Sequence, residues 1–213
     1  MSYLTIENRA SDEFEEKKSV FIGHIKRTET EEEAKEFVNE IKKQYKDARH
    51  NVYAYVIGEN AGIQRYSDDG EPKGTGGIPV LEVIKKNELR NVTIVVTRYF
   101  GGILLGAGGL TRAYSKGASV SIKAGGIVEK VIGVPIKIEL PYDLLGKVQY
   151  ICASNNWHIE DTQYTDQVEL QMYCEKEKLE MIMKTLINET AAKVSISEGD
   201  EGFFFKKGDR LIK

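Results

Sequence analysis

The segment VTIVVTRYFGGILLGAGGLTRAYSKG, residues 92–117, decides the fold of the first half of this chain. It begins with a β-branched apolar run, continues through a basic and aromatic turn, and then carries five glycines between Gly101 and Gly109. The residues after these glycines have a composition that suits a helix, with Arg112 and Lys116 four positions apart. This order predicts a buried strand, a glycine-rich loop and a helix that starts at about Leu110.

A second unusual stretch, RYSDDGEPKGTGGIP at residues 65–79, precedes the first. It holds three acidic residues, four glycines and two prolines. Proline lacks a backbone N–H and glycine raises the entropic cost of ordering, so a regular helix or strand cannot run throughout the stretch. We therefore predict a structured loop here.

The glycine-rich segment suits an anionic ligand. Glycines let backbone N–H groups approach a ligand closely, and a helix N-terminus adds partial positive charge. The chain has a net charge of −3, but residues 85–133 carry 8 basic against 2 acidic residues, a balance of +6. Interleaved basic and aromatic side chains are what recognition of RNA by backbone contacts and stacking needs. The candidate residues for binding an anion or nucleic acid are Lys73, Arg98, Tyr99, Gly101, Gly102, Gly106, Gly108, Gly109, Arg112 and Lys116. The alternative role of these glycines is tight packing of a helix on a sheet.

The acidic stretch offers the only weak candidates for catalysis. Asp68, Asp69 and Glu71 could act as a general base or hold a magnesium ion, which prefers carboxylate oxygens. The alternative, which we favour, is a structural turn. In it the side chain of Asp68 or Asp69 accepts hydrogen bonds from backbone N–H groups, and Gly70 has a positive φ.

Familiar cofactor fingerprints do not fit the chain. The glycine-rich loop lacks the GK[ST] ending of a P-loop and the third glycine of GxGxxG. His24, His50 and His158 are scattered without metal-ligand spacing. No cofactor and no metal ion is therefore expected, and enzymatic activity is not favoured.

Periodicity predicts two α+β domains that meet near residue 133. In the first, strands are expected at 3–7, 19–26, 52–57, 92–97 and 127–132, and helices at 30–46, 78–86 and 110–123. In the second, strands are expected at 136–140, 157–164, 168–173 and 193–205, and helices at 142–153 and 177–188. The second set has the order βαββαβ, which is the order of a ferredoxin-like plait.

Two motifs, SDDGEPKGTGG at residues 67–77 and TRYFGGILLGAGGLTRAY at residues 97–114, together resemble the signature of the IMPACT family. The resemblance covers nearly the whole chain. It implies a domain similar to the second domain of ribosomal protein S5 at residues 1–133, a ferredoxin-like domain similar to an elongation-factor domain at 134–205, and a polar tail at 206–213. The eukaryotic namesake is similar in the first domain only and is a translational regulator, which suggests a ribosome-linked or protein partner.

Composition is ordinary for a soluble protein, with 41% apolar and 30% charged residues. No apolar run approaches the roughly 20 residues that span a bilayer, and the polar start is unlike a secretory signal, so a cytoplasmic location without membrane contact is expected. Cys152 and Cys174 have no CxxC spacing and are predicted to be buried free thiols.

Three functions from different classes follow from these features. The favoured one is a non-enzymatic binding module for nucleic acid or the ribosome, with a role in translation regulation. The second is an enzyme that holds an anionic small substrate between the acidic and glycine-rich loops. The third is a protein-interaction adaptor.

Overall fold

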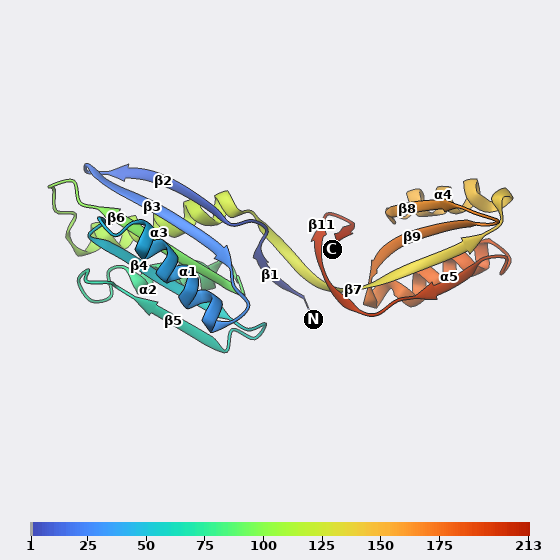
Figure 1. Cartoon of the computed structure of the whole chain (residues 1–213), viewed down its shortest axis with the longest axis horizontal. Coiled ribbons are helices and arrows are strands. Elements are labelled where there is room, and N and C mark those ends of the chain that lie inside the picture. Colours follow the sequence, from blue (N-terminus) through green and yellow to red (C-terminus); the bar gives the residue numbers. More distant parts are fainter. Residues whose placement is uncertain (1) are drawn as a thin grey trace. The chain divides into compact units, whose positions relative to one another are not determined.

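The computed structural model describes residues 2–213 and contains two compact units, one of residues 3–128 and the other of residues 129–213. Both units combine helices with antiparallel sheets, so the α+β class is confirmed (Figure 1). No helix within residues 2–213 is long and apolar enough to cross a membrane.

The N-terminal unit is built on a five-stranded antiparallel sheet with the order β2-β3-β6-β4-β5. Its elements are β1 (Tyr3–Ile6), β2 (Ala10–Glu16), β3 (Ser19–Arg27), α1 (Glu31–Gln44), β4 (His50–Ile57), β5 (Ile63–Ser67), α2 (Gly77–Lys86), β6 (Val92–Tyr99) and α3 (Gly106–Gly125). The central strand β6 is buried almost throughout, as its apolar run predicted.

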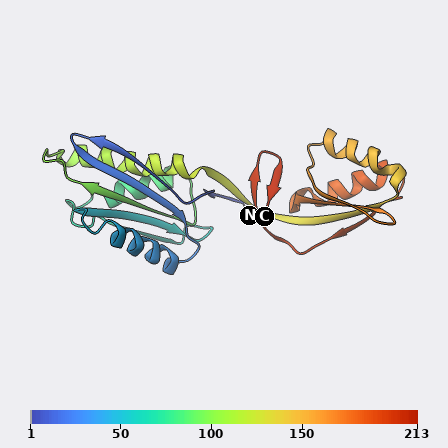
Figure 2. The same cartoon turned by 45° about the horizontal axis from the view of Figure 1, so that its top comes forward.

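Helices cover both faces of this sheet. Helix α1 packs through Phe37, Val38 and Ile41 against Val95, which lies on one face of β6. Helices α2 and α3 bury their apolar sides in a larger core on the other face. Figure 2 shows α1 (blue) and α3 (yellow-green) on opposite sides of the strands.

The predicted start of α1 is confirmed. The hydroxyl of Thr30 accepts a hydrogen bond from the Glu33 N–H at 3.1 Å. Three glutamates occupy the first turn, where their negative charges interact favourably with the positive end of the helix dipole. Helix α3 differs from the expectation because it begins at Gly106, one turn earlier than Leu110. Three glycines expected in a loop therefore form the first turn of a helix.

Two strands of the first sheet were not predicted. Strand β2 is an exposed edge strand that is rich in acidic residues, and its side chains Ala10 and Phe14 pack against the core. Strand β5 forms the opposite edge and is mostly exposed. Neither edge strand shows the alternation of apolar residues that sequence patterns detect.

The second unit holds the predicted βαββαβ order. Its elements are β7 (Ile127–Leu140), a 3₁₀ turn (Tyr142–Leu144), α4 (Leu145–Ser154), β8 (Ile159–Tyr164), β9 (Val168–Glu175), a second 3₁₀ turn (Lys176–Lys178), α5 (Leu179–Glu189), β10 (Ser195–Glu198), β11 (Gly202–Lys207) and β12 (Arg210–Ile212). The four strands of the plait have the order β10-β7-β9-β8. Helices α4 and α5 share one core on one face of this sheet, and Cys152 and Cys174 are buried there as free thiols.

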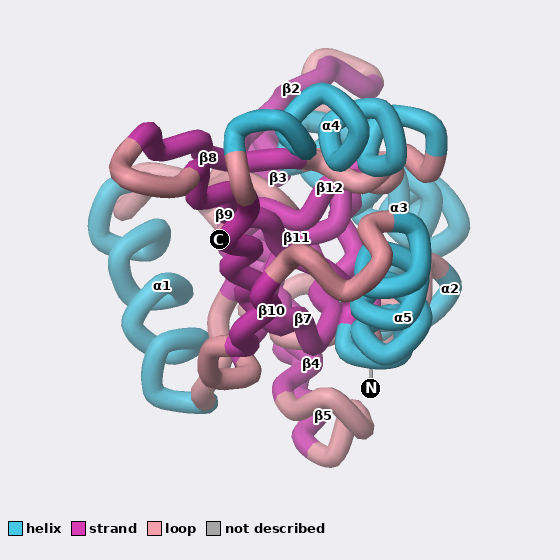
Figure 3. The backbone as a smooth tube through the Cα atoms, turned by 90° about the vertical axis from the view of Figure 1, so that its right-hand side faces the viewer, coloured by secondary structure: helices cyan, strands magenta, loops and turns pink. Residues whose placement is uncertain are grey.

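The C-terminal end of the chain differs from the expectation. The single strand predicted at 193–205 is divided into β10 and β11, which pair with successive parts of β7. The segment expected to be a polar tail forms β12, which pairs with β11 as a hairpin (magenta, Figure 3). Burial of Leu211 stabilises this hairpin, because its side chain is only 3% exposed and packs with Val131 and Phe204.

Helix α3 packs so closely on β3 that there is no room for a side chain at position 23, which is a glycine. A Cβ atom at Gly23 would lie 2.1 Å from the carbonyl oxygen of Gly117. We expect Gly23→Ala to lower the free energy of unfolding by roughly 1–3 kcal/mol, measured by urea denaturation. The control is Gly108→Ala, whose new Cβ meets only the Arg112 guanidinium at 3.6 Å, and its stability should change by less than about 1 kcal/mol. Equal stability of both variants would contradict this packing.

Candidate functional site

The acidic loop is folded around the side chain of Asp68. One carboxylate oxygen accepts hydrogen bonds from the N–H groups of Gly76 at 3.0 Å and Gly77 at 2.8 Å, and the other accepts from Gly74 at 2.8 Å. Gly76 and Gly77 form the N-terminus of α2, so Asp68 caps this helix from a distance. Gly70 takes a φ of +88°, which confirms the predicted turn.

These hydrogen bonds also set the charge of Asp68. Burial alone would raise the pKa of its carboxyl, but the three backbone N–H donors hold the pKa below its usual range. A carboxylate that is held ionised and fully occupied by backbone donors is a structural cap rather than a general base.

Asp69 is occupied in the same way. Its carboxylate pairs with the Lys42 ammonium at 2.5 Å and accepts the backbone N–H of Asn51 at 2.7 Å. Its carbonyl oxygen lies 2.8 Å from Nδ1 of His50. Asp69 therefore ties the acidic loop to α1 and to the start of β4.

Glu71 joins the acidic loop to the glycine-rich segment. Its Oε1 accepts hydrogen bonds from Arg98 of β6 at 2.6 Å and from the Tyr114 hydroxyl of α3 at 2.7 Å, and Nε2 of His50 lies 3.9 Å away. Glu71 and Arg98 are only 9% and 5% exposed. The two motifs thus converge on one buried cluster of Glu71, Arg98, Tyr114 and His50, which we term the Glu71 cluster.

Three members of the Glu71 cluster are buried, and His50 is half-buried. The Arg98 guanidinium lies 5.4 Å from the ring centres of both Phe21 and Phe100, so aromatic side chains flank it. Burial and then the neighbouring Glu71 carboxylate raise the pKa of the Tyr114 hydroxyl, which keeps it protonated as a donor. Nothing in this arrangement leaves a base or a nucleophile facing a substrate.

This placement revises the expected role of Arg98, because a buried guanidinium that pairs with Glu71 is not offered to a surface phosphate. Tyr99 also has an internal partner, since its hydroxyl donates to Asp47 at 3.0 Å. His50 was missed as a member of the site, and Tyr114, one of the interleaved aromatic residues of the motif, is buried and donates to Glu71. The register that sets His50 opposite Arg98 on the neighbouring strand is not visible in a single sequence.

The glycines of the second motif have different roles. Gly101 packs against the chain at Lys18, where a Cβ atom would lie 2.0 Å from the backbone, and its N–H donates to the Ser19 hydroxyl. Gly102 and Gly106 have φ values of +83° and +69°, which favour glycine, and no atom lies within 4 Å of a Cβ built there. Packing accounts for Gly101, whereas Gly102 shapes an open loop and Gly106 begins α3 at its end.

Helix α3 begins with an open N-terminus. Among residues 2–213 no side chain caps it, and its first turn contains no acidic residue. The N–H groups of the first turn of a helix have no partner within the helix, so those of Gly106, Ala107 and Gly108 are free to meet an anion. Arg112 and Lys116 are exposed on the next turns, and Lys116 lies over the Phe14 ring at 4.2 Å. We term Gly106–Gly109, Arg112 and Lys116 the α3 face.

Apolar side chains project from the loop that precedes the α3 face. Leu104 is 83% exposed, and Ile103 and Phe100 are about half as exposed. The guanidinium of Arg49 lies 5.9 Å from the Phe100 ring centre. We term Phe100, Ile103 and Leu104 the loop tip. Lys73 is exposed in the acidic loop.

The described residues, 2–213, contain no group of three or more His, Cys, Asp or Glu side chains arranged to hold a metal ion.

Comparison with known proteins places the chain in a family. The family described as Impact N-terminal domain matches residues 17–122, and a domain of unknown function, DUF1949, matches residues 138–193. The chain is 42% identical over 199 residues to "IMPACT family member YvyE" of Bacillus subtilis (strain 168), and the match covers 93% of this chain and 92% of that protein. The chain belongs to the IMPACT family.

Two further comparisons agree with this membership. "IMPACT family member YigZ" of Escherichia coli (strain K12) is 43% identical over 109 residues, which cover 50% of this chain and 53% of that protein. A solved structure described as "Crystal structure of an hypothetical protein" is 29% identical in sequence to this chain and superposes on it with a TM-score of 0.59. The superposition covers 92% of this chain and 96% of the solved one. The match therefore includes both units of the fold.

The Glu71 cluster makes a quantitative prediction about stability. Glu71→Ala leaves the buried Arg98 guanidinium without its carboxylate, so we expect the free energy of unfolding to fall by roughly 3–5 kcal/mol in urea denaturation. The control is Glu82→Ala on α2, which removes an exposed pair with Lys85 and should cost less than about 1 kcal/mol. A loss as small as that of the control would show that the cluster does not hold the two motifs together.

The Asp68 cap predicts a dependence of stability on pH. Because the pKa of Asp68 is lower in the folded state than the ordinary value of 3.8, its stabilisation is present above that value and is lost as pH falls through the folded-state pKa. We expect Asp68→Ala to be less stable than the wild type near neutral pH, and the gap between the two unfolding free energies to shrink below about pH 4. Urea titrations over a pH series measure this gap, and a gap that stays constant contradicts the cap.

Proposed function

We propose that this IMPACT-family protein is a non-enzymatic module of the cytoplasm that binds RNA, on the ribosome or alone, through the α3 face. The observation that carries the proposal is the open N-terminus of α3, which has no acidic residue in its first turn and is followed by exposed Arg112 and Lys116. Free backbone N–H groups next to two cations suit phosphate oxygens. A role in translation regulation is part of the same proposal, on the strength of the family.

The occupied carboxylates support binding over catalysis. Asp68, Asp69 and Glu71 each have two or more hydrogen-bond or ion-pair partners inside the protein. Using any of them as a general base would first require breaking contacts that hold the fold. The enzyme hypothesis therefore has no group ready for chemistry in this region.

The loop tip adds a stacking surface to the proposed interface. Phe100 is 40% exposed and is one peptide bond from Gly101, so its ring borders the open loop that leads into α3. An exposed ring beside cations is the arrangement that binds single-stranded nucleic acid with little dependence on sequence.

A protein-interaction adaptor is the second candidate, and Leu104 favours it. A leucine that is 83% exposed next to an exposed isoleucine is suited to an apolar groove on a protein. In this reading the cations of the α3 face would flank the contact rather than form it.

We also propose a fold assignment for each unit. We assign the N-terminal unit to a ribosomal protein S5 domain 2-like fold and the plait of the second unit to a ferredoxin-like fold. The strand order β10-β7-β9-β8 with both helices on one face supports the second assignment.

Salt-dependent binding tests the proposal. We expect the full chain to bind single-stranded RNA or ribosomes with a log affinity that falls linearly with log salt concentration. The double variant Arg112→Ala/Lys116→Ala should bind more weakly and lower the salt slope by about two, one for each phosphate contact. Fluorescence anisotropy with labelled RNA and co-sedimentation with ribosomes measure both quantities.

The matched control is Lys35→Ala/Lys43→Ala, which removes the same charge from exposed positions of α1, on the opposite face of the sheet. Equal binding by the two double variants would refute the α3 face as the interface. Binding that depends on Leu104 but is insensitive to salt would favour the adaptor over the RNA-binding module.

A further inference from the structure

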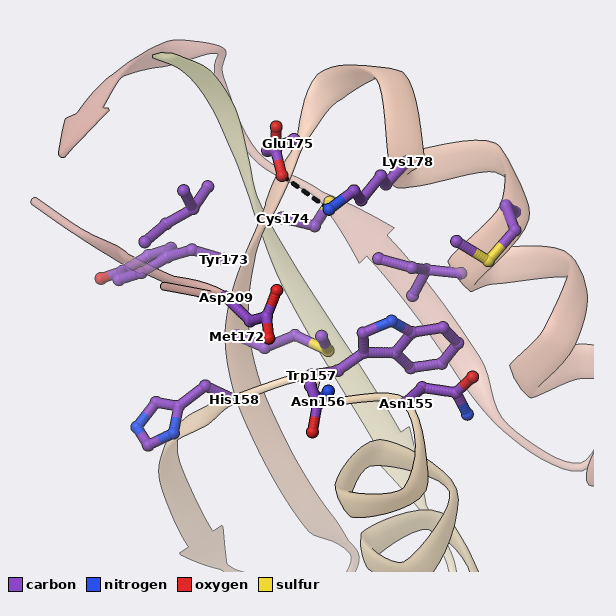
Figure 4. A pocket seen from close by; sticks show the side chains of 13 residues that line it. Asn155, Asn156, Trp157, His158, Met172, Tyr173, Cys174, Glu175, Lys178 and Asp209 are labelled. Carbon is purple, nitrogen blue, oxygen red and sulfur yellow. Dashed lines mark ion pairs between the residues drawn. The ribbon is translucent and has the colours of Figure 1, made fainter. Parts of the chain in front are cut away.

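A pocket of about 190 Å³ lies in the second unit, whereas the proposed RNA interface belongs to the first (Figure 4). Three parts of the unit line it: the turn between α4 and β8, the end of β9 with the start of α5, and the hairpin of β11 and β12. Since a water molecule takes about 30 Å³ of the liquid, the space suits a ligand of roughly six to ten non-hydrogen atoms.

Ion pairs hold the hairpin over this pocket. The Arg210 guanidinium of β12 makes two bonds to the Glu160 carboxylate of β8, at 3.1 and 2.8 Å. Lys206 of β11 lies 3.2 Å from the carboxylate of Glu175 on β9. Leu211 of β12 is buried as well, so ion pairs and an apolar contact together anchor the hairpin beside the pocket.

The pocket is lined about equally by polar side chains, such as Asn155, Asn156 and His158, and by apolar and polarisable ones. Its lining includes the ring of Trp157, the thioethers of Met172 and Met181, and the side chains of Ile182 and Leu211. Figure 4 shows the Trp157 ring and the Met172 side chain bordering the same space. Such a lining favours a ligand with a hydrocarbon or flat apolar part.

Cys174 belongs to this lining but is not a nucleophile. Burial, followed by the nearby carboxylates of Glu175 and Glu198, raises the pKa of its thiol to about 11. The thiol is therefore protonated at neutral pH and forms part of the apolar wall.

The charges around the pocket leave one carboxylate in excess. Glu175 pairs with Lys178 at 2.7 Å (dashed in Figure 4), and Lys206 is shared between Glu175 and Glu129. Asp209 has no ion-pair partner within 4.0 Å among residues 2–213, although it contributes to the raised pKa of Lys178 after the larger effect of Glu175. Its carboxylate faces the pocket in Figure 4.

We infer that this pocket binds a small organic ammonium compound, with its apolar part against Trp157, Met172 and Met181 and its charged nitrogen at Asp209. An indole face and an excess carboxylate both attract a cation, and the apolar wall accepts the carbon skeleton. Free apolar amino acids and simple alkylamines share this chemistry. The site is independent of the α3 face, so its test does not depend on RNA binding.

Trp157 makes the test direct because it is the only tryptophan in the chain. The full chain is titrated with isoamylammonium, and with isoamyl alcohol as the uncharged counterpart of the same shape. We expect a saturable change in Trp157 emission with the ammonium probe and at least about tenfold weaker binding of the alcohol. Methyl NMR signals of Met172 and Met181 give a second readout that does not rely on fluorescence.

Asp209→Asn should weaken binding of isoamylammonium about tenfold and leave binding of the alcohol unchanged. The control is Asp166→Asn, an exposed acid in the turn between β8 and β9 that does not line the pocket and should have no effect. L-Leucine adds a carboxylate to the same carbon skeleton and so distinguishes the two classes of ligand. Tighter binding of leucine than of isoamylammonium assigns the site to amino acids, and weaker binding assigns it to amines.

Three results would overturn the inference. They are no saturable shift of either Trp157 emission or the methionine methyl signals, equal affinity for the ammonium and the alcohol, and an Asp209→Asn variant that binds isoamylammonium as tightly as the Asp166→Asn control.

Discussion

The buried carboxylate of Glu71 is the contact on which the N-terminal unit depends. It accepts hydrogen bonds from Arg98 on the central strand and from Tyr114 on α3, so one side chain joins the acidic loop, the sheet and a helix. A charge this deeply buried is tolerated only with its partners in place. The shape of the acidic loop follows from the same need, because Asp68 and Asp69 fasten the loop on either side before Glu71 enters the core.

This constraint separates the residues that make the motifs unusual from those that are free to act. Glu71 of the first motif pairs with Arg98 and Tyr114 of the second, and Asp68 and Asp69 have other partners inside the protein. Their tight partnership leaves the open N-terminus of α3, its two cations and the loop tip as the part of the motifs that faces solvent. The acidic motif is therefore mainly structural, as the sequence favoured, and the surface that we propose for binding lies beside it.

The sequence predicted much of the fold and part of the site. Apolar periodicity located β6, the Thr30 cap and the βαββαβ order, because buried faces leave a repeating pattern. It missed β2, β5 and β12, because these edge strands are largely exposed and lack an alternation of apolar and polar residues. It also placed Arg98 at the surface, because charge alone does not show that Glu71 lies opposite. Leu211, an apolar residue in a mostly polar segment, was too weak a signal for the hairpin that lines the pocket of the second unit.

The central claim is that the solvent-facing part of the second motif, and not the occupied acids of the first, meets the partner of this protein. Hydrogen exchange of the full chain, followed by mass spectrometry with and without ribosomes or single-stranded RNA, tests it most directly. The account predicts slower exchange in peptides that cover residues 100–112, whose N–H groups at the loop and the start of α3 would become bound, and no change in α1. Protection confined to α1 or to the second unit, with residues 100–112 exchanging as before, would contradict the account.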